Sequence, residues 1–360
     1  MNAGFWKGKR VLVTGHTGFK GSWLSIWLAR LGAEVVGYAL APPTSPSNFA
    51  LSRVGETMQS IESDIRDLQA LEDCVARHRP EIVLHLAAQS LVRRSYGDPV
   101  ETFQSNVMGT VNLLEAVRRH PSARAVVVVT SDKCYENREW HWGYRENEAM
   151  GGHDPYSGSK GCAELVAASY RNSFFPPDEH ARHGVAVASA RAGNVVGGGD
   201  WSEDRLVPDI LDAHANGREL IIRSPAAVRP WQFVLEPLHG YMTLAERLYN
   251  DGPNFAEAWN FGPRDADVLT VEALIRRLSS HLDGGVAYRV AADERPHEAT
   301  LLKLDCSKAA ARLGWQPRTT LDDALRRIAD WQNAFLAGRD MREVSIQQIE
   351  NFQKISQGCR

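Results

Sequence analysis

The chain has 360 residues, 43% of them hydrophobic and 24% charged, which is typical of a globular protein of about two domains. Its 41 Lys and Arg residues nearly balance 44 Asp and Glu residues, and the net charge of −3 offers no basic face for nucleic acid. No apolar run approaches the roughly 18 residues that cross a bilayer, and the run Val11–Val13 ends at once at Thr14, so we expect neither a membrane span nor a signal peptide. The five scattered cysteines argue against a disulfide framework or a metal cluster and favour a cytoplasmic protein.

Short strands rich in β-branched residues alternate with helical patterns in the first half of the chain. The first strand, Arg10–Thr14, leads into a Gly-rich turn and a helix from about Phe19 to Leu31, in which apolar residues recur at helical spacing. This alternation predicts an α/β fold with a doubly wound parallel (Rossmann) sheet and helices on both faces. Later strands are predicted at 34–38, 81–86, 125–130 and 185–190, and later helices at about 98–120 and 155–174.

The pattern changes after about Asn194, where three consecutive glycines and several prolines break the chain into shorter pieces. We therefore expect residues 1–193 to form the Rossmann domain, with 230–262 returning to it. Residues 194–229 and 263–345 should form a smaller C-terminal α/β domain. Residues 346–360 are expected to be a tail, and the polar stretch beyond about Asp340 a loosely packed helix.

A glycine-rich turn, residues 15–21 (GHTGFKG), joins the first strand to its helix. The GxxGxxG spacing lets the backbone turn tightly and approach a pyrophosphate whose charge meets the helix N-terminus. The strand–turn–helix context favours a dinucleotide site, and a structural βα turn is the alternative. The second strand ends in Tyr38-Ala39-Leu40, without the acidic residue that often binds the ribose of NAD, so this segment does not decide the cofactor.

Tyr156 and Lys160 lie four residues apart at the start of a helix opened by Asp154-Pro155. Because residues at i and i+4 share one helix face, we expect the ammonium to lie beneath the phenol and lower its pKa from about 10. Such a phenol can remove a proton from a sugar hydroxyl while a hydride passes to a nicotinamide. A surface Tyr–Lys contact would be the alternative if the pair stood alone.

Three polar residues, Ser131, Asp132 and Lys133, follow the apolar run Val126–Val129. Ligands bind at the carboxyl ends of strands in an open parallel sheet, so these side chains are candidates for catalysis. Ser131 could hydrogen-bond the reacting hydroxyl, and Asp132 with Lys133 would add acid–base chemistry that simple hydride transfer does not need. A turn with a solvated Asp–Lys pair is the alternative.

With these motifs, the chain resembles the extended short-chain dehydrogenase/reductase family, and within it the nucleotide-sugar 4,6-dehydratases. The resemblance covers nearly the whole chain, from the glycine turn through the Ser131/Tyr156/Lys160 triad to the RAGN segment that ends at Asn194. The GHTGFKGSWL and SDKCYEN segments are most similar to the branch that acts on CDP-glucose. The branch that acts on dTDP-glucose has Asp-Glu where this chain has Asp132-Lys133.

The resemblance implies a lyase that uses NAD to convert CDP-D-glucose into CDP-4-keto-6-deoxy-D-glucose. Tyr156, assisted by Lys160 and Ser131, would remove the C4 hydroxyl proton as hydride passes to NAD, water would leave across C5 and C6, and hydride would return to C6. Asp132 would protonate the departing C6 hydroxyl, for which it must be neutral. Lys133 would either lose its own proton in a desolvated site or stabilise the enolate.

The resemblance also implies contacts to two ligands and no metal ion. Arginines suit the diphosphate of the substrate because the guanidinium fork matches its oxygens. The implied cofactor contacts are Gly15, Thr17, Gly18, Phe19, Lys20, Asp64, Ile65, Leu86, Ala87, Ala88, Asn106, Thr130, Tyr156, Lys160 and Arg191. The implied substrate contacts are Gln89, Ser90, Ser131, Asn194, Arg205, Leu206, Arg229, Asn260, Arg295 and His297.

Alternative functions are another nucleotide-sugar 4,6-dehydratase, acting on dTDP-glucose or GDP-mannose, a nucleotide-sugar 4-epimerase, or a non-catalytic dinucleotide sensor. The implied setting is deoxysugar and O-antigen biosynthesis. The family commonly pairs two helices per chain into a four-helix dimer interface, so we expect a homodimer, with a tetramer left open. The apolar second faces of helices 98–120 and 155–174 would form it, through Val107, Val111, Leu114, Leu165 and Ala168.

Overall fold

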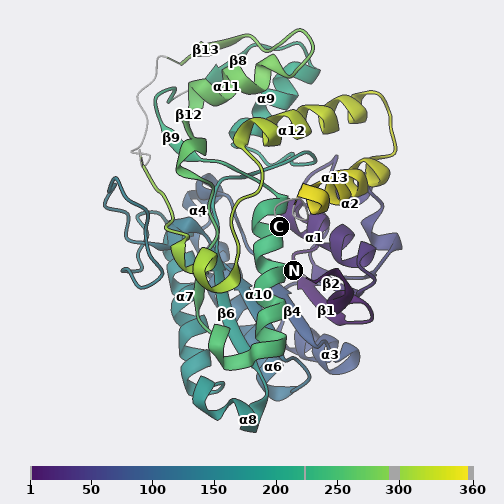
Figure 1. The fold of residues 1–360 in the computed structure, drawn as a ribbon, viewed down its shortest axis with the longest axis vertical. Coiled ribbons are helices and arrows are strands. Elements are labelled where there is room, and N and C mark those ends of the chain that lie inside the picture. The colour runs from purple at the N-terminus through teal and green to yellow at the C-terminus, as the bar shows by residue number, and fades with distance from the viewer. Residues whose placement is uncertain (1, 223, 292–300, 356–360) are drawn as a thin grey trace.

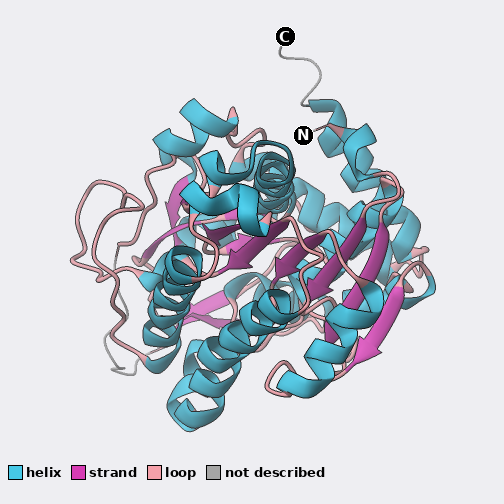
Figure 2. Cartoon of the chain, turned by 90° about the horizontal axis from the view of Figure 1, so that it is seen from below, coloured by secondary structure: helices cyan, strands magenta, loops and turns pink. Residues whose placement is uncertain are grey.

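The computed structural model describes residues 2–222, 224–291 and 301–355 (Figure 1). A sheet of seven parallel strands, in the order β11-β6-β5-β4-β1-β2-β3, crosses its centre (Figure 2). Strand β5, with the sequence AVVVV, is buried along its whole length, as expected for a strand covered on both faces. The strands are β1 (Arg10–Thr14), β2 (Glu34–Ala39), β3 (Gln59–Glu62), β4 (Ile82–His85), β5 (Ala125–Val129), β6 (Ala186–Arg191) and β11 (Ala258–Asn260).

Helices cover both faces of this sheet (Figure 2), and each face has its own hydrophobic core. Leu113 and Val117 lie in the core beneath α3, α6 and α7, and Trp27 and Leu238 lie in the core beneath α1 and α10. The doubly wound prediction is therefore confirmed. These helices are α1 (Phe19–Arg30), α3 (Leu68–His78), α6 (Gly109–Arg119), α7 (Pro155–Ser173) and α10 (Leu235–Asp251). No helix within the described ranges is long and apolar enough to cross a membrane.

The order of the strands reverses between β1 and β4. From β1 the chain moves outward to β2 and β3, and then returns to β4 on the other side of β1 before moving on to β5 and β6. The loops that leave the carboxyl ends of β1, β4 and β5 therefore meet at one edge of the sheet. This switch point is where open α/β sheets bind their ligands.

The second half of the chain contains three two-stranded sheets, pairing β7 with β10, β9 with β12, and β8 with β13. Strand β11 returns to the large sheet beside β6, as expected. Gln232 and Phe233 instead pair with Val195 and Val196 in a small sheet. The short strands are β7 (Val195–Val196), β8 (Leu220–Ile222), β9 (Val228–Pro230), β10 (Gln232–Phe233), β12 (Val268–Thr270) and β13 (Tyr288–Val290). The remaining helices are α2 (Asn48–Leu51), α4 (Val92–Gly97), α5 (Pro99–Phe103), α8 (His180–His183), α9 (Leu206–Ala215), α11 (Val271–Ser280), α12 (Leu321–Leu336) and α13 (Met341–Ile355).

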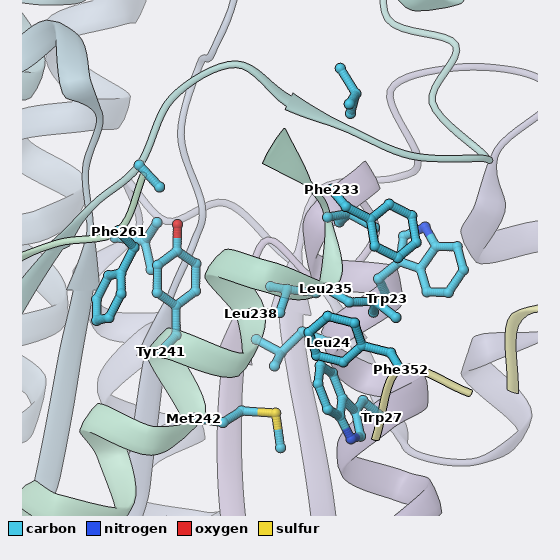
Figure 3. Packing of buried hydrophobic residues seen from close by; sticks show 14 of the residues in the cluster. Trp23, Leu24, Trp27, Phe233, Leu235, Leu238, Tyr241, Met242, Phe261 and Phe352 are labelled. Carbon is cyan, nitrogen blue, oxygen red and sulfur yellow. The ribbon is translucent and has the colours of Figure 1, made fainter. Parts of the chain in front are cut away.

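The expectation of a loosely packed C-terminal helix was wrong. Helix α13 buries Ile349 and Phe352 completely, and the ring of Phe352 meets the edge of Trp27 at a centroid distance of 5.7 Å (Figure 3). Arg30 adds an ion pair with Glu350 at 2.8 Å. The helix looks polar in sequence because its few apolar residues occupy a single face, and that face packs on α1.

The helix predicted at 98–120 is interrupted. Helix α5 and helix α6 are joined by a π-helical turn, Gln104–Met108, a distortion often found at functional sites. Leu114 is completely buried beneath α6, so its assignment to the second, outward face was incorrect.

Candidate active site

The glycine turn is shaped by close backbone contacts. Gly15 adopts a φ of +75°, and a Cβ built there would lie 2.7 Å from the amide nitrogen of Ala87. A Cβ on Gly21 would lie 2.0 Å from the carbonyl oxygen of Gly15. Two of the three glycines are therefore required by the turn itself, without any ligand.

Gly18 is different, because a Cβ there would meet only the Gly15 carbonyl, at an ordinary 3.4 Å. It is the N-cap of α1, makes no side-chain cap, and is followed by a first turn without acidic residues. The amides of that turn can therefore receive an anion. The residues present fit the pyrophosphate of a dinucleotide.

Lys20 lies in the first turn of α1, close enough to Lys160, Arg205 and Asp132 for their charges to change its pKa. Burial and the nearby cations of Lys160 and Arg205 lower the pKa of Lys20 to about 7, while Asp132 acts to raise it. Lys20, Lys160 and Arg205 thus place three basic side chains near Asp132, and the carboxylates of Glu164 and Asp200 lie beside two of them.

Tyr38, which stands where an acidic residue often binds ribose, is almost completely buried. Its hydroxyl donates to the carbonyl of Asp64 at 3.0 Å and accepts from Ser63 at 2.9 Å. Hydrogen bonds from Arg66 lower the pKa of the Asp64 carboxyl. Tyr38 thus supports the loop that carries Asp64 and Ile65, the predicted cofactor contacts after β3.

Tyr156 and Lys160 are both buried in the first turns of α7. The helix begins at Pro155, and the side chain of Asp154 accepts from the Ser157 amide at 2.9 Å, an N-cap that fixes where the helix starts. The Lys160 ammonium donates to the carbonyl of Val129 at 3.4 Å. The predicted helix, its start and the shared face of the pair are therefore all present.

The expected fall in the pKa of Tyr156 is not found. Burial raises the pKa of Tyr156 to about 12, although a side-chain hydrogen bond between Tyr156 and Ser131 acts to lower it. Lys160 instead donates to the Val129 carbonyl, and the groups that act to lower the pKa of the phenol are Ser131 and Arg205. Burial also lowers the pKa of Lys160 to about 8, opposed by the carboxylate of Glu164.

The segment after β5 forms a short 3-10 turn, Asp132–Cys134, capped by Ser131. The Ser131 hydroxyl accepts from the Lys133 amide at 3.2 Å and donates to the carboxylate of Asp132 at 3.0 Å. Asp132 is nearly fully buried, and Asn194 reaches its other oxygen at 3.5 Å. The turn therefore places a carboxyl group beside the Ser131–Tyr156 pair.

Two predicted substrate contacts of the second half, Asn194 and Arg205, lie near this turn, since Asn194 contacts Asp132 and the charge of Arg205 acts on Tyr156. Arg205 precedes α9 and donates to Asp200 and Ser90, each at 3.2 Å. Leu206 opens α9 and Arg229 lies in β9. Arg295 and His297 fall outside the described residues.

The side chains of five predicted ligand contacts are buried and hydrogen-bonded to other parts of the protein. The Asn106 amide joins the backbone of Gln89 to Ser159, with three bonds of 2.8–2.9 Å. The Gln89 side chain forms hydrogen bonds with the backbone of Leu91 and with the hydroxyl of Thr102. The remaining three, Thr130, Arg191 and Asn260, belong to a hydrogen-bond network around the Ser131–Cys134 turn.

That network includes Glu164 and Tyr135, which the sequence reasoning missed. Glu164 accepts from Thr130, from Ser189 at 2.6 Å and from Arg191 at 2.8 Å. The sequence does contain a signal for Glu164, because Tyr156, Lys160 and Glu164 follow one another at intervals of four on α7 and so share one helix face. No cluster of metal-ligating side chains occurs among the residues that the structure describes.

The parallel sheet, the glycine turn and the Ser131–Tyr156–Lys160 set define an extended short-chain dehydrogenase/reductase. A family model described as GDP-mannose 4,6 dehydratase matches residues 12–328, and the chain belongs to this family of nucleotide-sugar dehydratases. The CDP-glucose 4,6-dehydratase of Salmonella typhimurium is 55% identical over 98% of both chains.

Solved structures agree with the fold. The UDP-glucose 4-epimerase of Thermus thermophilus in complex with NAD is similar with a TM-score of 0.76 and 25% identity, over 90% of this chain and 99% of that one. The dTDP-glucose 4,6-dehydratase of Bacillus anthracis in complex with NAD has a TM-score of 0.74 and 19% identity, over 91% and 97% of the two chains.

Proposed function

We propose that the protein is an NAD-dependent CDP-glucose 4,6-dehydratase, a hydro-lyase that releases CDP-4-keto-6-deoxy-D-glucose. The full-length identity of 55% to a relative with this activity supports the substrate and the reaction. The glycine turn and the free N-terminus of α1 fit NAD. NAD held there would supply the hydride acceptor for C4 of the sugar and the hydride donor for C6.

The residues of the chain move the protons. Tyr156 takes the proton of the C4 hydroxyl, and Ser131 orients that hydroxyl through its contact with the phenol. The resulting ketone acidifies C5, so that the proton at C5 and the hydroxyl at C6 can leave as water. Asp132, beside Ser131, is placed to protonate the departing hydroxyl, and Lys133 stabilises the enolate as a cation or removes the C5 proton as an amine.

The observation that carries this proposal is the buried carboxyl of Asp132 next to the Ser131–Tyr156 pair. Oxidation and reduction at C4, which a 4-epimerase performs, need the pair but no acid for a leaving hydroxyl. The fold is shared with epimerases, so the residues after β5 separate the two activities.

The test is incubation of the purified protein with NAD and, separately, with CDP-, dTDP-, GDP- and UDP-glucose and GDP-mannose, followed by mass spectrometry. We expect the loss of one water from CDP-glucose alone. Loss of water from another nucleotide sugar would overturn the base specificity. An unchanged mass with conversion of glucose to galactose would identify an epimerase.

We further propose a homodimer that pairs helices α5 and α7 of two chains. Apolar side chains are exposed on this face, including Val100 at 65%, Phe103 at 40%, Met108 at 49% and Leu165 at 60%. An exposed apolar patch of this kind is typical of a protein–protein interface.

The wider setting is also a proposal. The product suits deoxysugar and O-antigen biosynthesis, and the free thiols of Cys74, Cys134, Cys162 and Cys306 suit the cytoplasm. We assign residues 1–193 and 230–262 to cofactor binding, and 194–229 with 263–345 to the nucleotide sugar.

A further inference from the structure

Glu164 and Arg191 form an ion pair at 2.8 Å in which each side chain is only 4% exposed. Burying two charges costs several kcal/mol per ion before their attraction is counted, and apolar replacements are often as stable. The pair is therefore poorly explained by stability alone. Its surroundings indicate another role.

Glu164 and Lys160, one helical turn apart on α7, hold consecutive residues at the end of β5. Lys160 donates to the carbonyl of Val129 at 3.4 Å, and the carboxylate of Glu164 accepts from the hydroxyl of Thr130. Ser131, the first residue of the catalytic turn, follows immediately. Glu164 thus fixes the point where the turn begins.

Arg191 holds the other end of the same turn. Its guanidinium donates to the hydroxyl of Tyr135 at 2.6 Å and lies 4.9 Å from the centre of the Tyr135 ring. Tyr135 is the residue directly after the turn Asp132–Cys134, and its hydroxyl donates onward to Asn260 at 2.7 Å. The two ends of the turn are therefore joined through one buried ion pair.

The charges of the pair also act on catalysis. Burial acts to raise the pKa of Glu164, but the charge of Arg191 and three hydrogen bonds outweigh it and lower that pKa. The resulting carboxylate opposes the loss of the proton from Lys160, whose pKa burial lowers to about 8. Without this carboxylate, more of the Lys160 population would be neutral at physiological pH.

We propose that Glu164 and Arg191 are positioning residues that clamp both ends of the Ser131–Cys134 turn, with the Glu164 carboxylate held one helical turn from Lys160. The inference rests on the proposed function, in which that turn and Lys160 serve the reaction. It predicts two separable consequences of removing the Glu164 carboxylate, one in the pH profile and one in the mobility of the turn.

The first experiment compares Glu164→Gln with the wild type in the full-length enzyme with NAD and CDP-glucose. The alkaline limb of the kcat profile should move down by about one pH unit, because a lost neighbouring charge shifts a buried group by about that amount. The KM for CDP-glucose should change less than twofold. The matched control is Glu72→Gln, since Glu72 is buried and forms an ion pair with Arg119 at 2.8 Å between α3 and α6. The alkaline limb of the kcat profile of this variant should stay where it is in the wild type.

The second experiment does not need turnover. In Glu164→Gln the side-chain NH2 cannot accept the hydrogen bonds that one carboxylate oxygen takes from Ser189 and Arg191, so the link between the two ends of the turn is lost. Hydrogen exchange followed by mass spectrometry should then show roughly tenfold faster exchange for the amides of Lys133 and Cys134, and no change in Glu72→Gln. Exchange that is no faster there than in the wild type overturns the clamp, whatever the substrate. A wild-type enzyme without water loss overturns the proposed function instead.

Glu164→Gln leaves the Arg191 charge buried without its partner, which can prevent folding. The double variant Glu164→Gln/Arg191→Met removes both charges and covers that case. It should show the same shift of the alkaline limb and the same faster exchange. A uniform loss of activity at every pH, with an unmoved limb, would reduce the pair to a structural role and overturn the proposal.

Discussion

Gly193 lies directly against the carboxyl group of Asp132, so closely that a Cβ on Gly193 would be 1.9 Å from the carboxyl carbon. Gly193 follows β6, whereas Asp132 follows β5. A glycine after one strand therefore makes room for the candidate acid of the next. The φ of this glycine is not positive, so the requirement is steric.

Gly193→Ala should displace the Asp132 carboxyl while leaving the backbone conformation accessible. We expect kcat for water loss to fall roughly 100-fold, within the range that general acid catalysis contributes, with binding of CDP measured by calorimetry unchanged. Gly97→Ala, at an exposed position where the φ is not positive and a Cβ would meet nothing within 4 Å, is the control for the effect of replacing a glycine by alanine. Full activity of Gly193→Ala would show that Asp132 need not stay where it is.

Lys133→Met should separate oxidation from water loss. Tyr156 and Ser131 remain, so the sugar should still reach the 4-keto stage, but the enolate would lose its cation. Quenching with sodium borodeuteride should trap deuterium at C4 of a sugar that has kept its C6 hydroxyl. Unchanged formation of the 6-deoxy product would remove Lys133 from the mechanism.

Lys20→Met distinguishes two anionic ligands. Because Lys20 lies in the first turn of α1, where the cofactor pyrophosphate is expected, we expect the affinity for NAD to fall about tenfold, or ~1.4 kcal/mol. Separate calorimetric titrations with NAD and with CDP make the measurement. A loss confined to CDP would instead assign the ammonium to the diphosphate of the nucleotide sugar, on the side of Arg205.

His85 should make the protein less stable in acid. Its Nδ1 accepts from Thr14 at 2.7 Å, because the Thr14 hydroxyl already accepts from the amides of Leu86 and Ala87. Burial lowers the pKa of His85 from 6.5 to about 3. His85 therefore binds a proton below about pH 6.5 in the unfolded chain, but only near pH 3 in the folded chain. Stability falls as the pH drops through this window.

Within this window, one such group lowers the free energy of unfolding by about 1.4 kcal/mol for each pH unit of acidification. Urea unfolding of His85→Gln at pH 7, 6 and 5 should show a flatter dependence than the wild type, whereas His141→Gln, at an exposed position, should not. Parallel curves for His85→Gln and the wild type would show that other groups dominate acid unfolding.

Leu165→Lys should separate the proposed dimer into single chains, because it places a charge on the exposed face of α7. Light scattering after gel filtration would measure the mass. Leu336→Lys on α12, also about half exposed, should leave the mass unchanged. A wild-type mass of 39.9 kDa would contradict the dimer before any variant is made.

The sequence by itself determined the sheet, its helices and the catalytic motifs, because these depend on short-range patterns. The apolar run before Ser131, the glycine spacing after Arg10–Thr14 and the Tyr156–Lys160 interval each act within a few residues of the chain. The strands and helices follow the same periodicities in the structure.

Only the tertiary structure decided which of these side chains bond to one another. Asn106, Arg191 and Asn260 are predicted ligand contacts, and their side chains bond to Ser159, Glu164 and Tyr135. The direction of a side chain depends on partners from distant segments, which no local pattern encodes. For the same reason the burial of Phe352, the high pKa of Tyr156 and the contact of Gly193 with Asp132 became visible only when the chain was folded.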